Sequence, residues 1–439
     1  TTIVNNGTQT GFGRTGTVNW DTTPKTATFS AVSGNGYFCN TTAGAITVNL
    51  PAGSAGEIVS LADYAGTWQT NNLTVSPNGT DKIGSVNADV SLNTEGQSVT
   101  FVYVDSTQGW LNTMDSTSNV RAELFICASV SGACNTLVTA PDCANVKIAT
   151  FTGPGTFTVN NVASCTVNNV ISHLVVAGGA GGGACGGGGG GAGGFREVKS
   201  PVTPYTASPL DGYPSAPNRV TVTATAFPIT VGAAGAGAAK PAGIGSTGSN
   251  SVFSTITSAG GGGGGQFNAP SSAGLPGGSG GGSGGIAPST IIAGGPGNQP
   301  PVSPSQGNNG GTGQHLSGCS MRSGGGGGAT TVGGNGATQT PGPGSGVGGT
   351  GGTGTTTSIT GSPLAYAGGG GGSGFENASG CGTSPCGTGG TGQGRAAAAS
   401  SGGTTNRGGG GGGGAHPGGG VNGGSAGGSG IVIIRYKFQ

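Results

Sequence analysis

The sequence predicts an all-β, glycine-rich protein with almost no α-helix: an N-terminal β-sandwich followed by a polyglycine II helix bundle on a small β base. Three observations predict this fold. Short stretches of the first 115 residues alternate apolar and polar side chains, as strands with one face in a core do. Glycine supplies 106 of the 439 residues, against a usual share of roughly 7%. Finally, strand-like pieces rich in β-branched residues lead directly into uninterrupted glycine runs.

Residues 1–115 are predicted to form a small β-sandwich. Turn residues such as Pro77, Asn78 and Gly79 separate the alternating segments. No helical period of about 3.6 residues competes with the alternation. The segment also holds enough aromatic side chains for a core of normal size. We expect this core to contain Trp20, Tyr37, Phe38, Tyr64, Trp68 and Trp110.

Residues 116–148 are predicted to be a connector that carries cysteines. Cys127, Cys134 and Cys143 lie within it, and Cys165 follows closely. The chain has nine cysteines, an odd number, with no Cys-x-x-Cys pair and no histidine-rich segment to supply zinc ligands. We therefore expect no structural metal, and the cysteines are interpreted as a few disulfides or as free thiols.

Residues 149–439 are predicted to form one glycine-rich module. Pieces such as ISHLVVAGGAGGG (171–183) and FSTITSAGGGGGG (253–265) change from strand to glycine. The last piece, GGSAGGSGIVIIRYKF (423–438), changes from glycine to strand. We expect the first strand of the module, within 147–161, to lie beside this last strand. Together they would form a base from which the glycine runs project.

Glycine runs of this kind form a scaffold when they pack side by side. Extended helices with three residues per turn approach closely where no Cβ intervenes, and they donate backbone N–H groups sideways to neighbouring carbonyls. We expect the uninterrupted runs 186–191, 260–265 and 408–414 at the centre of the bundle, and mixed runs such as 277–285 and 342–354 at its periphery. The alternative is a disordered Gly/Ser linker. The strand-like segments that bracket the glycine runs favour the bundle.

Composition and motifs argue against several classes of function. Charged residues make up only 6% of the chain and the net charge is +1, so we expect no nucleic-acid partner. No apolar stretch approaches the roughly 20 residues that span a bilayer, so we expect no membrane insertion. The sequence lacks a strand-to-helix nucleotide motif, a Walker lysine, a His-Glu-x-x-His motif and an evident carboxylate pair. We predict that the protein is not an enzyme and has no catalytic residue, metal or cofactor.

Motifs in both modules carry a resemblance to a known family. In the second module they are GTFTV (155–159), HLVVAGGAGGG (173–183), NSVFSTITSAGGGGGG (250–265), NRGGGGGGG (406–414) and GGSGIVIIRY (427–436). This module resembles the glycine-rich domain of bacteriophage tail fibres, common in marine phages including those of cyanobacteria. The first module, through GYF (36–38), ITVNLPAGSAGEIVSLADYAG (46–66), NNLTVSPNG (71–79) and VYVDSTQGW (102–110), is similar to a β domain of marine phage structural proteins.

The resemblance implies a non-enzymatic, extracellular tail-fibre or adhesin protein of a virion. The second module also resembles in architecture the polyglycine-sandwich adhesins at the tips of T-even-like tail fibres, whose loops contact the host receptor. Expected partners are a bacterial surface receptor, protein or glycan, and other tail proteins, with a homotrimer as one possible assembly. The alternative is a purely structural virion or extracellular fibre subunit. An ice-binding bundle is a third interpretation, which the irregular loops disfavour.

Three segments between glycine runs, 195–219, 306–323 and 375–395, are the expected receptor-binding loops. Loops on a rigid scaffold often carry binding residues, and aromatic and arginine side chains are favoured anchors. For any single residue a structural or solvated role is the more frequent one. We expect these loops to collect at the end of the bundle opposite the base. The candidate receptor-binding residues are Arg196, Tyr205, Asp211, Tyr213, Arg219, His315, Arg322, Phe375 and Arg395.

Overall fold

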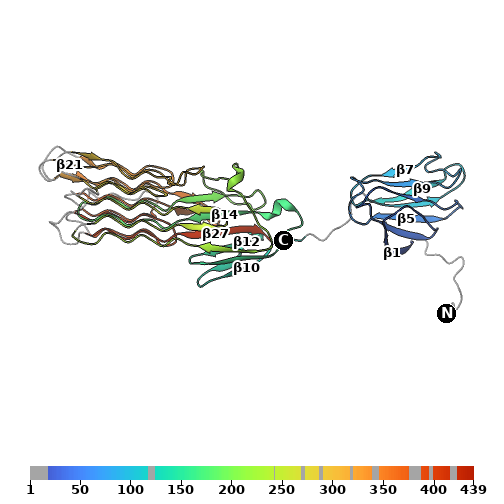
Figure 1. Ribbon diagram of the computed structural model, residues 1–439, viewed down its shortest axis with the longest axis horizontal. Coiled ribbons are helices and arrows are strands. Elements are labelled where there is room, and N and C mark those ends of the chain that lie inside the picture. Colours follow the sequence, from blue (N-terminus) through green and yellow to red (C-terminus); the bar gives the residue numbers. More distant parts are fainter. Residues whose placement is uncertain are drawn as a thin grey trace. The chain divides into compact units, whose positions relative to one another are not determined.

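The computed structural model consists of two compact units, Thr1–Ala122 and Glu123–Gln439 (Figure 1). It describes residues 18–116, 124–241, 243–267, 272–285, 290–316, 320–338, 346–374, 387–394, 399–415 and 423–439. Within these ranges the only helical elements are two short 3₁₀ turns, η1 (Thr166–Asn169) and η2 (Ala216–Asn218). The prediction of an all-β, glycine-rich fold is confirmed.

The first unit is a sandwich of two β-sheets. One sheet has the order β1-β3-β5-β8-β9 (Asn19–Lys25, Asn35–Cys39, Ile58–Asp63, Ser98–Tyr103, Trp110–Ser116). The other has the order β2-β4-β6-β7 (Phe29–Ser30, Ile46–Asn49, Leu73–Ser76, Val90–Leu92). From β1 to β6 successive strands alternate between the sheets, so neighbours within a sheet run parallel: β1 with β3, β3 with β5, β2 with β4 and β4 with β6.

The core of the first unit lies between the sheets and includes part of the predicted aromatic set. Trp68, Trp110 and Tyr37 are buried there, among apolar residues of both sheets. Three expected core residues are instead outside it: the exposed fraction is 41% for Trp20 and 55% for Tyr64, and the half-buried Phe38 packs against Trp20. Aromatic content predicts a core of adequate size, but it does not tell which face of a strand each ring occupies.

The base of the second unit consists of two larger sheets. The first has the order β11-β12-β27-β14-β15 (Thr136–Ala140, Cys143–Phe151, Ile431–Lys437, Val170–Val176, Phe195–Val198), and β16 (Val220–Thr221) pairs with β14. The second has the order β10-β13-β17-β18-β19 (Cys127–Ser131, Gly155–Asn161, Ala226–Thr230, Ser251–Phe253, Ile256–Ser258).

The last strand of the chain, β27, lies between two of the earliest strands of the unit. It pairs antiparallel with β12 on one side and with β14 on the other. This confirms that the first and last strands of the module lie side by side in a base. Both faces of the sheet are covered by apolar side chains: Val432 and Ile434 point into one cluster, and Ile431 and Ile433 into another.

The structure corrects the connector expected over residues 116–148. Its described part from 124 onward belongs to the second unit, where it forms β10, β11 and the beginning of β12. These strands pair with segments before and after them, β10 with β13 and β11 with β12. Short pieces such as CASVS and TLVTA become strands because partner strands are available, and sequence alternation alone does not reveal those partners.

Beyond the base, the glycine runs form a lattice of backbone hydrogen bonds. Along the run 186–194, successive N–H groups donate to three different runs, and the pattern repeats every three residues. Residues 188, 191 and 194 donate to Gly265, Gly262 and Ala259, residues 189 and 192 to Gly324 and Gly327, and residues 190 and 193 to Gly411 and Gly408. The N···O distances are 2.8 to 3.1 Å. Three residues per repeat is the period of the polyglycine II helix.

The carbonyl groups of the same run accept from three further runs. Carbonyls 188, 191 and 194 accept from Gly183, Ala180 and Ala177, carbonyls 189 and 192 from Gly282 and Ser279, and carbonyls 187 and 190 from Ser373 and Gly370. The run 186–194 is therefore surrounded by six others, in a hexagonal arrangement. In Figure 1 the runs extend from the two base sheets toward the end that carries β21.

The run 408–414 also has six neighbours, as predicted for uninterrupted glycine, but the mixed run 277–285 is not peripheral. It hydrogen-bonds with runs on all sides, and Ser279 and Ser283 in it are fully buried. Alanine likewise fits inside the lattice, because Ala180 and Ala192 are fully buried in central runs. A small side chain is tolerated where the facing run provides space, so the composition of one run does not determine its place.

The remaining strands are short hairpins at the two ends of the bundle. At the end far from the base lie β20, β21 and β22 (Ile291–Ile292, Gly313–Leu316, Ser320–Arg322) and the pair β23 and β24 (Ala337–Thr338, Gly346–Val347). The hairpin of β25 and β26 (Thr355–Thr357, Leu364–Tyr366) packs on the base, where Tyr366 joins the apolar cluster of Ile431 and Ile433. We call the far end, with β20 to β24, the distal end.

Two glycines of one outer run provide a matched test of the lattice. A Cβ on Gly245 would overlap the backbone oxygen of Gly181, whereas a Cβ on Gly243 would have Ala238 Cβ as its nearest atom, at 3.5 Å. We expect Gly245→Ala to lower the free energy of unfolding by about 1–3 kcal/mol. Gly243→Ala should leave it unchanged or raise it by up to about 1 kcal/mol, because alanine restricts the unfolded chain. Denaturant unfolding of both variants measures this, and equal losses would contradict the lattice.

Candidate functional site

The structure separates the predicted receptor-binding residues into two groups. The segment 195–219 begins with β15 and lies on the base, whereas β21 and β22, within 306–323, lie at the distal end (Figure 1). The expectation that all three loops collect opposite the base is therefore wrong for 195–219. Phe375 and Arg395 lie outside the described residues. The glycine run 186–194 leads into β15, and β15 pairs with β14 in the base sheet. The segment that follows β15 therefore begins at the base.

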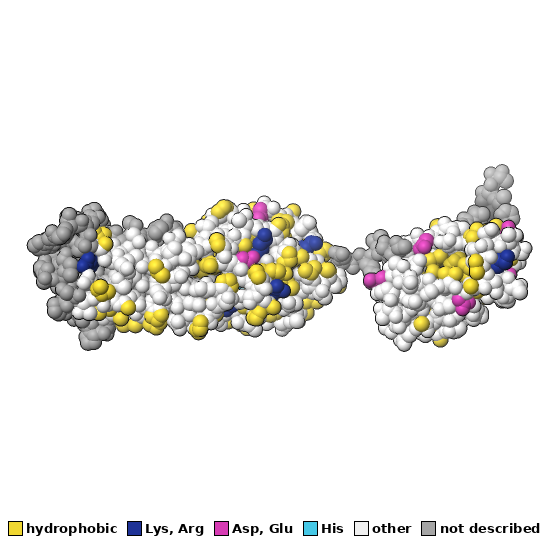
Figure 2. All heavy atoms as spheres, turned by 90° about the horizontal axis from the view of Figure 1, so that it is seen from above, with side chains coloured by type: hydrophobic (Ala, Val, Ile, Leu, Met, Phe, Trp, Pro, Cys, Tyr) yellow, Lys and Arg dark blue, Asp and Glu magenta, His cyan; other side chains and the backbone are white. Residues whose placement is uncertain are grey.

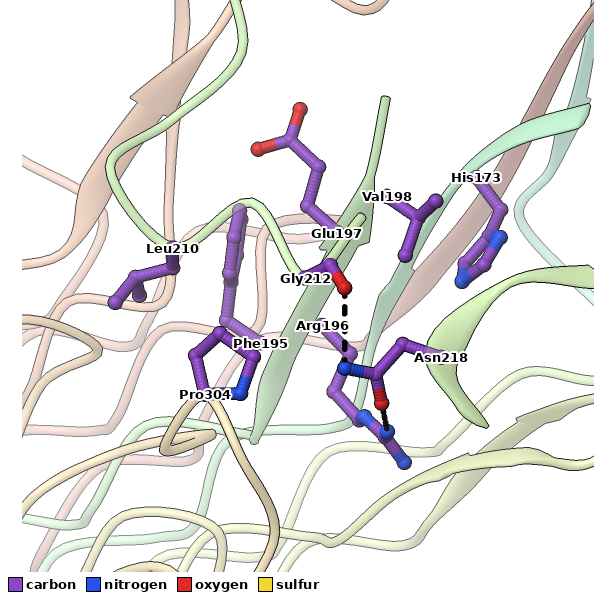
Figure 3. A pocket seen from close by; sticks show the side chains of 9 residues that line it. All are labelled: His173, Phe195, Arg196, Glu197, Val198, Leu210, Gly212, Asn218 and Pro304. Carbon is purple, nitrogen blue, oxygen red and sulfur yellow. Dashed lines mark hydrogen bonds between the residues drawn. The ribbon is translucent and has the colours of Figure 1, made fainter. Parts of the chain in front are cut away.

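Arg196 holds the 195–219 segment to its surroundings. Its Nη2 donates to Asn218 Oδ1 at 2.6 Å, and its Nη1 donates to the Thr257 carbonyl at 3.4 Å. Asn218 in turn donates to the carbonyls of Gly212 and Ser303, at 3.2 and 2.8 Å. Figure 3 shows the Arg196 and Asn218 side chains directed toward one another. Arg196 and Asn218 thus belong to an internal hydrogen-bond network.

Asp211 and Tyr205 also have internal partners. Asp211 Oδ1 accepts from the backbone N–H groups of Lys199 and Tyr213, at 3.0 and 2.9 Å, which closes a turn of the segment. Tyr205 is buried, and the Arg435 guanidinium lies 5.2 Å from its ring centroid. Charged and aromatic residues such as these are rare in this chain, which is why the sequence singles them out. In the structure their contacts fix the segment on the base.

Tyr213 and Arg219 form the more exposed part of the segment. The Arg219 guanidinium stacks over the Tyr213 ring at 4.3 Å, and Arg219 Nε donates to the Tyr213 carbonyl at 2.7 Å. Arg219 is exposed and Tyr213 is half-buried. A guanidinium on an aromatic face is a rigid surface pair, and such a pair can contact a ligand without reordering.

The sequence analysis missed a buried polar cluster beneath this segment. Arg435 is fully buried in β27, and its Nη2 contacts Asp142 Oδ1 at 3.0 Å and Oδ2 at 3.1 Å. The same guanidinium donates to the carbonyls of Ile359 and Pro204, at 3.1 and 2.6 Å. The sequence feature that could have indicated this cluster is the arginine within the apolar segment IVIIRYK. A buried arginine requires a polar or charged partner.

Glu197 is a further ionisable residue of this region. It is buried, and its carboxylate accepts from the Ser208 backbone N–H at 2.9 Å and from the Thr357 hydroxyl. Burial raises the pKa of Glu197, while its hydrogen bonds with Ser208 and Thr357 oppose that rise. These bonds join the base segment to the β25–β26 hairpin, so the cluster ties together loops that are distant in sequence.

His173 is buried on β14 at a small cavity. The cavity has a volume of about 10 Å³, near that of a single water site, and Arg196 and Glu197 also line it (Figure 3). Neither ring nitrogen of His173 has a hydrogen-bond partner within the described structure. Burial, and secondly the charge of Arg196, lower the pKa of His173 to about 3. The imidazole is therefore neutral at physiological pH, and the cavity is too small for an organic substrate.

The distal end carries the other described candidates. Arg322 on β22 donates from Nη2 to Gln314 Oε1 on β21 at 2.6 Å, and its backbone bridges to Gly374. His315 pairs in register with Met321 across the same hairpin. Ile291 on the adjacent β20 is 65% exposed. This end therefore presents a cation and an apolar side chain on a hairpin anchored to the bundle.

The described residues contain no cluster that suggests a metal centre. No group of three or more His, Cys, Asp or Glu side chains is gathered in that part of the chain. The described cysteines, at positions 39, 127, 134, 143, 165 and 185, are free thiols. Burial, and then the charge of Asp63, raise the pKa of Cys39 to about 12, so this thiol stays protonated. Over the same described residues, no helix is long and apolar enough to cross a membrane.

His173 gives a testable pH dependence. Because its pKa is lower in the folded protein than its usual 6.5, protonation favours the unfolded state. The stability that it confers is complete above about pH 6.5 and is lost toward pH 3, at about 1.4 kcal/mol per pH unit. We expect His173→Leu to keep or slightly raise stability at pH 7, since it removes two unpartnered polar atoms. Denaturant unfolding from pH 7 to pH 4 should show the variant losing less stability than the wild type, and parallel curves would contradict this.

Comparison with known proteins places the second unit in a family. The family model described as "Glycine-rich domain" matches residues 151–437, which is more than half of the chain. This span begins at the end of β12 and closes at the end of β27, so it includes all the glycine runs and the base strands from β13 onward, while β10, β11 and most of β12 precede it. No curated protein matches the sequence. The chain belongs to the glycine-rich domain family.

Proposed function

We propose that the protein is a non-enzymatic adhesin of a bacteriophage tail fibre, located in the virion and exposed to the exterior. In this proposal it binds a bacterial cell-surface receptor through the distal end of the glycine bundle. The observation that carries the proposal is the six-neighbour backbone lattice. Such a lattice anchors the described strands β20, β21 and β22 at its far end, and the connections carried by a rigid scaffold are where proteins commonly place binding residues.

The surface chemistry of the second unit supports the distal end as the contact region. In Figure 2 the described side of the bundle between its two ends is almost without charged side chains, and most of the charges surround the base. Arg322 lies at the distal end, held by Gln314, and Ile291 is exposed on the neighbouring strand. Arginine and apolar side chains together are frequent anchors of protein interfaces.

The same reasoning gives most of the base residues a structural role. Arg196, Tyr205 and Asp211 lie on the base, away from the distal end, and their bonds fix the segment there, so the proposal no longer includes them as receptor contacts. The stack of Tyr213 and Arg219 remains a secondary surface, exposed but far from the distal end. The assignment to a tail fibre rests on the motif resemblance described above, since family membership establishes only the glycine-rich domain.

A matched pair of arginine variants tests the proposal in a phage that carries the chain. We expect Arg322→Gln at the distal end to reduce adsorption to host cells about tenfold, as loss of an interface anchor does. Arg219→Gln, at the base, should leave adsorption nearly unchanged. Both variants should retain the thermal stability of the parent, because neither residue is in an apolar core.

The outcome that contradicts receptor binding is also specific. If replacing residues 313–322 by two glycines leaves adsorption intact while particles assemble normally, the distal end does not recognise the host. If residues 1–115 are then exchanged for the corresponding residues of a related phage, and assembly changes but host range does not, the alternative of a purely structural fibre subunit is supported.

A further inference from the structure

A row of paired residues crosses the outer face of the five-stranded sheet in the first unit. Cross-strand partners share a face of a sheet. The register joins Trp20 on β1 to Gly36 on β3, Ser60 on β5, Thr100 on β8 and Met114 on β9. The two ends of this row are large side chains, and the middle of it is small. The row therefore forms a trough with Trp20 on one side and Met114 on the other.

The neighbouring row of cross-strand partners extends the trough. It joins Phe38, Ala62, Ser98 and Ser116 across the same four strands from β3 to β9. The rings of Phe38 and Trp20 pack together, with centroids 4.9 Å apart and planes inclined by 30°. An aromatic wall thus borders a floor of small residues. The hollow between the walls measures about 520 Å³, within the range of small-molecule sites.

Gly36 explains how the tryptophan lies. A Cβ on Gly36 would overlap atoms of the Trp20 six-membered ring and a methyl group of Val18. The indole therefore rests directly against the Gly36 backbone and lies along the sheet. With 41% of Trp20 exposed, part of a flat aromatic surface faces the hollow. The fully buried Trp68 and Trp110 provide no such surface.

Polar groups line the rest of the trough. The hydroxyls of Ser60 and Thr100 form a hydrogen bond of 2.7 Å on the floor. On the β9 side, Thr113 and Ser116 are exposed. The residues that line the hollow include no cation, and the one acidic residue among them, Asp115, pairs with the core residue Val99, so its side chain belongs to the other face of the sheet. Donors and acceptors are therefore plentiful, while the net charge of the hollow is small.

We propose that this trough is a saccharide-binding site that takes one or two rings of an uncharged sugar. The C–H face of a pyranose packs on the exposed tryptophan, and its hydroxyls hydrogen-bond to Thr113 and the serine hydroxyls. An anionic ligand is disfavoured, because no lining cation would attract it. A wholly apolar ligand is also disfavoured, since it would displace water from the Ser98 and Thr113 hydroxyls without offering a hydrogen bond in return. This site lies in a different unit from the distal end and is independent of the proposed receptor contact.

Tryptophan fluorescence of the full chain tests the site. The probes are maltohexaose, cellohexaose, laminarihexaose and chitohexaose, titrated separately to concentrations above a Kd on the order of 1 mM. We expect at least one of them to change the fluorescence of the wild type in a saturable way. Of the three tryptophans only Trp20 is exposed, so Trp20→Phe should abolish the change. Calorimetric titration should show binding at least about tenfold weaker for Trp20→Ala.

The matched control is Tyr64→Ala, which removes another exposed aromatic ring of the same unit outside the trough. It should bind the sugar as the wild type does, and all variants should unfold at the same temperature. The proposal is overturned if none of the four probes binds. It is overturned equally if Trp20→Ala binds as tightly as Tyr64→Ala, or if sedimentation shows that Trp20 instead mediates self-association of the chain.

Discussion

The backbone hydrogen bond between adjacent glycine runs is the interaction on which the second unit depends. Because each run repeats every three residues, its N–H and C=O groups point in several directions, and a central run such as 186–194 is satisfied only by six neighbours. Each bond contributes about 0.5–1.5 kcal/mol net, whereas ordering the backbone costs about 1–2 kcal/mol per residue. The lattice alone is therefore close to balance, and its stability requires an attachment that fixes the runs before they pair.

The base supplies that attachment. Strand β14 continues without interruption into the run 177–184, and the run 186–194 leads directly into β15, so the strand register sets the register of the runs. The sheet is covered on both faces by apolar side chains, which provide the burial that glycine lacks. The ion pair between the buried Arg435 and the exposed Asp142, together with the bonds of Glu197, then fastens the intervening loops to this sheet. Polar residues in this region thus position the loops.

Much of the fold follows from the sequence, and the exceptions have a common cause. Uninterrupted glycine and a terminal apolar strand are local features, so the central runs and the pairing of β12 with β27 were predictable. The place of Ser279 and Ser283 depends on which runs face them, for example on Gly307 beside Ser279. The exposure of Trp20 depends on Gly36 in a neighbouring strand, and the separation of Arg196 from Arg322 depends on which end of a run each loop follows. These are pairwise relations across the fold, which one-dimensional patterns do not contain.

A core made of backbone changes what constrains the sequence. In an apolar core, side-chain volume must be conserved, and a change of even one methylene group alters the stability of the protein. In the glycine lattice the constraint is the absence of side chains at central positions, while the side chains of outer runs and distal hairpins do not contribute to the core. Residues such as Ile291 and Val332, exposed by 65% and 60%, can therefore vary without disturbing the hydrogen bonds beneath them. A surface under this weak constraint can change its side chains quickly while the scaffold stays the same, which is the property that the proposed recognition of cell surfaces would require.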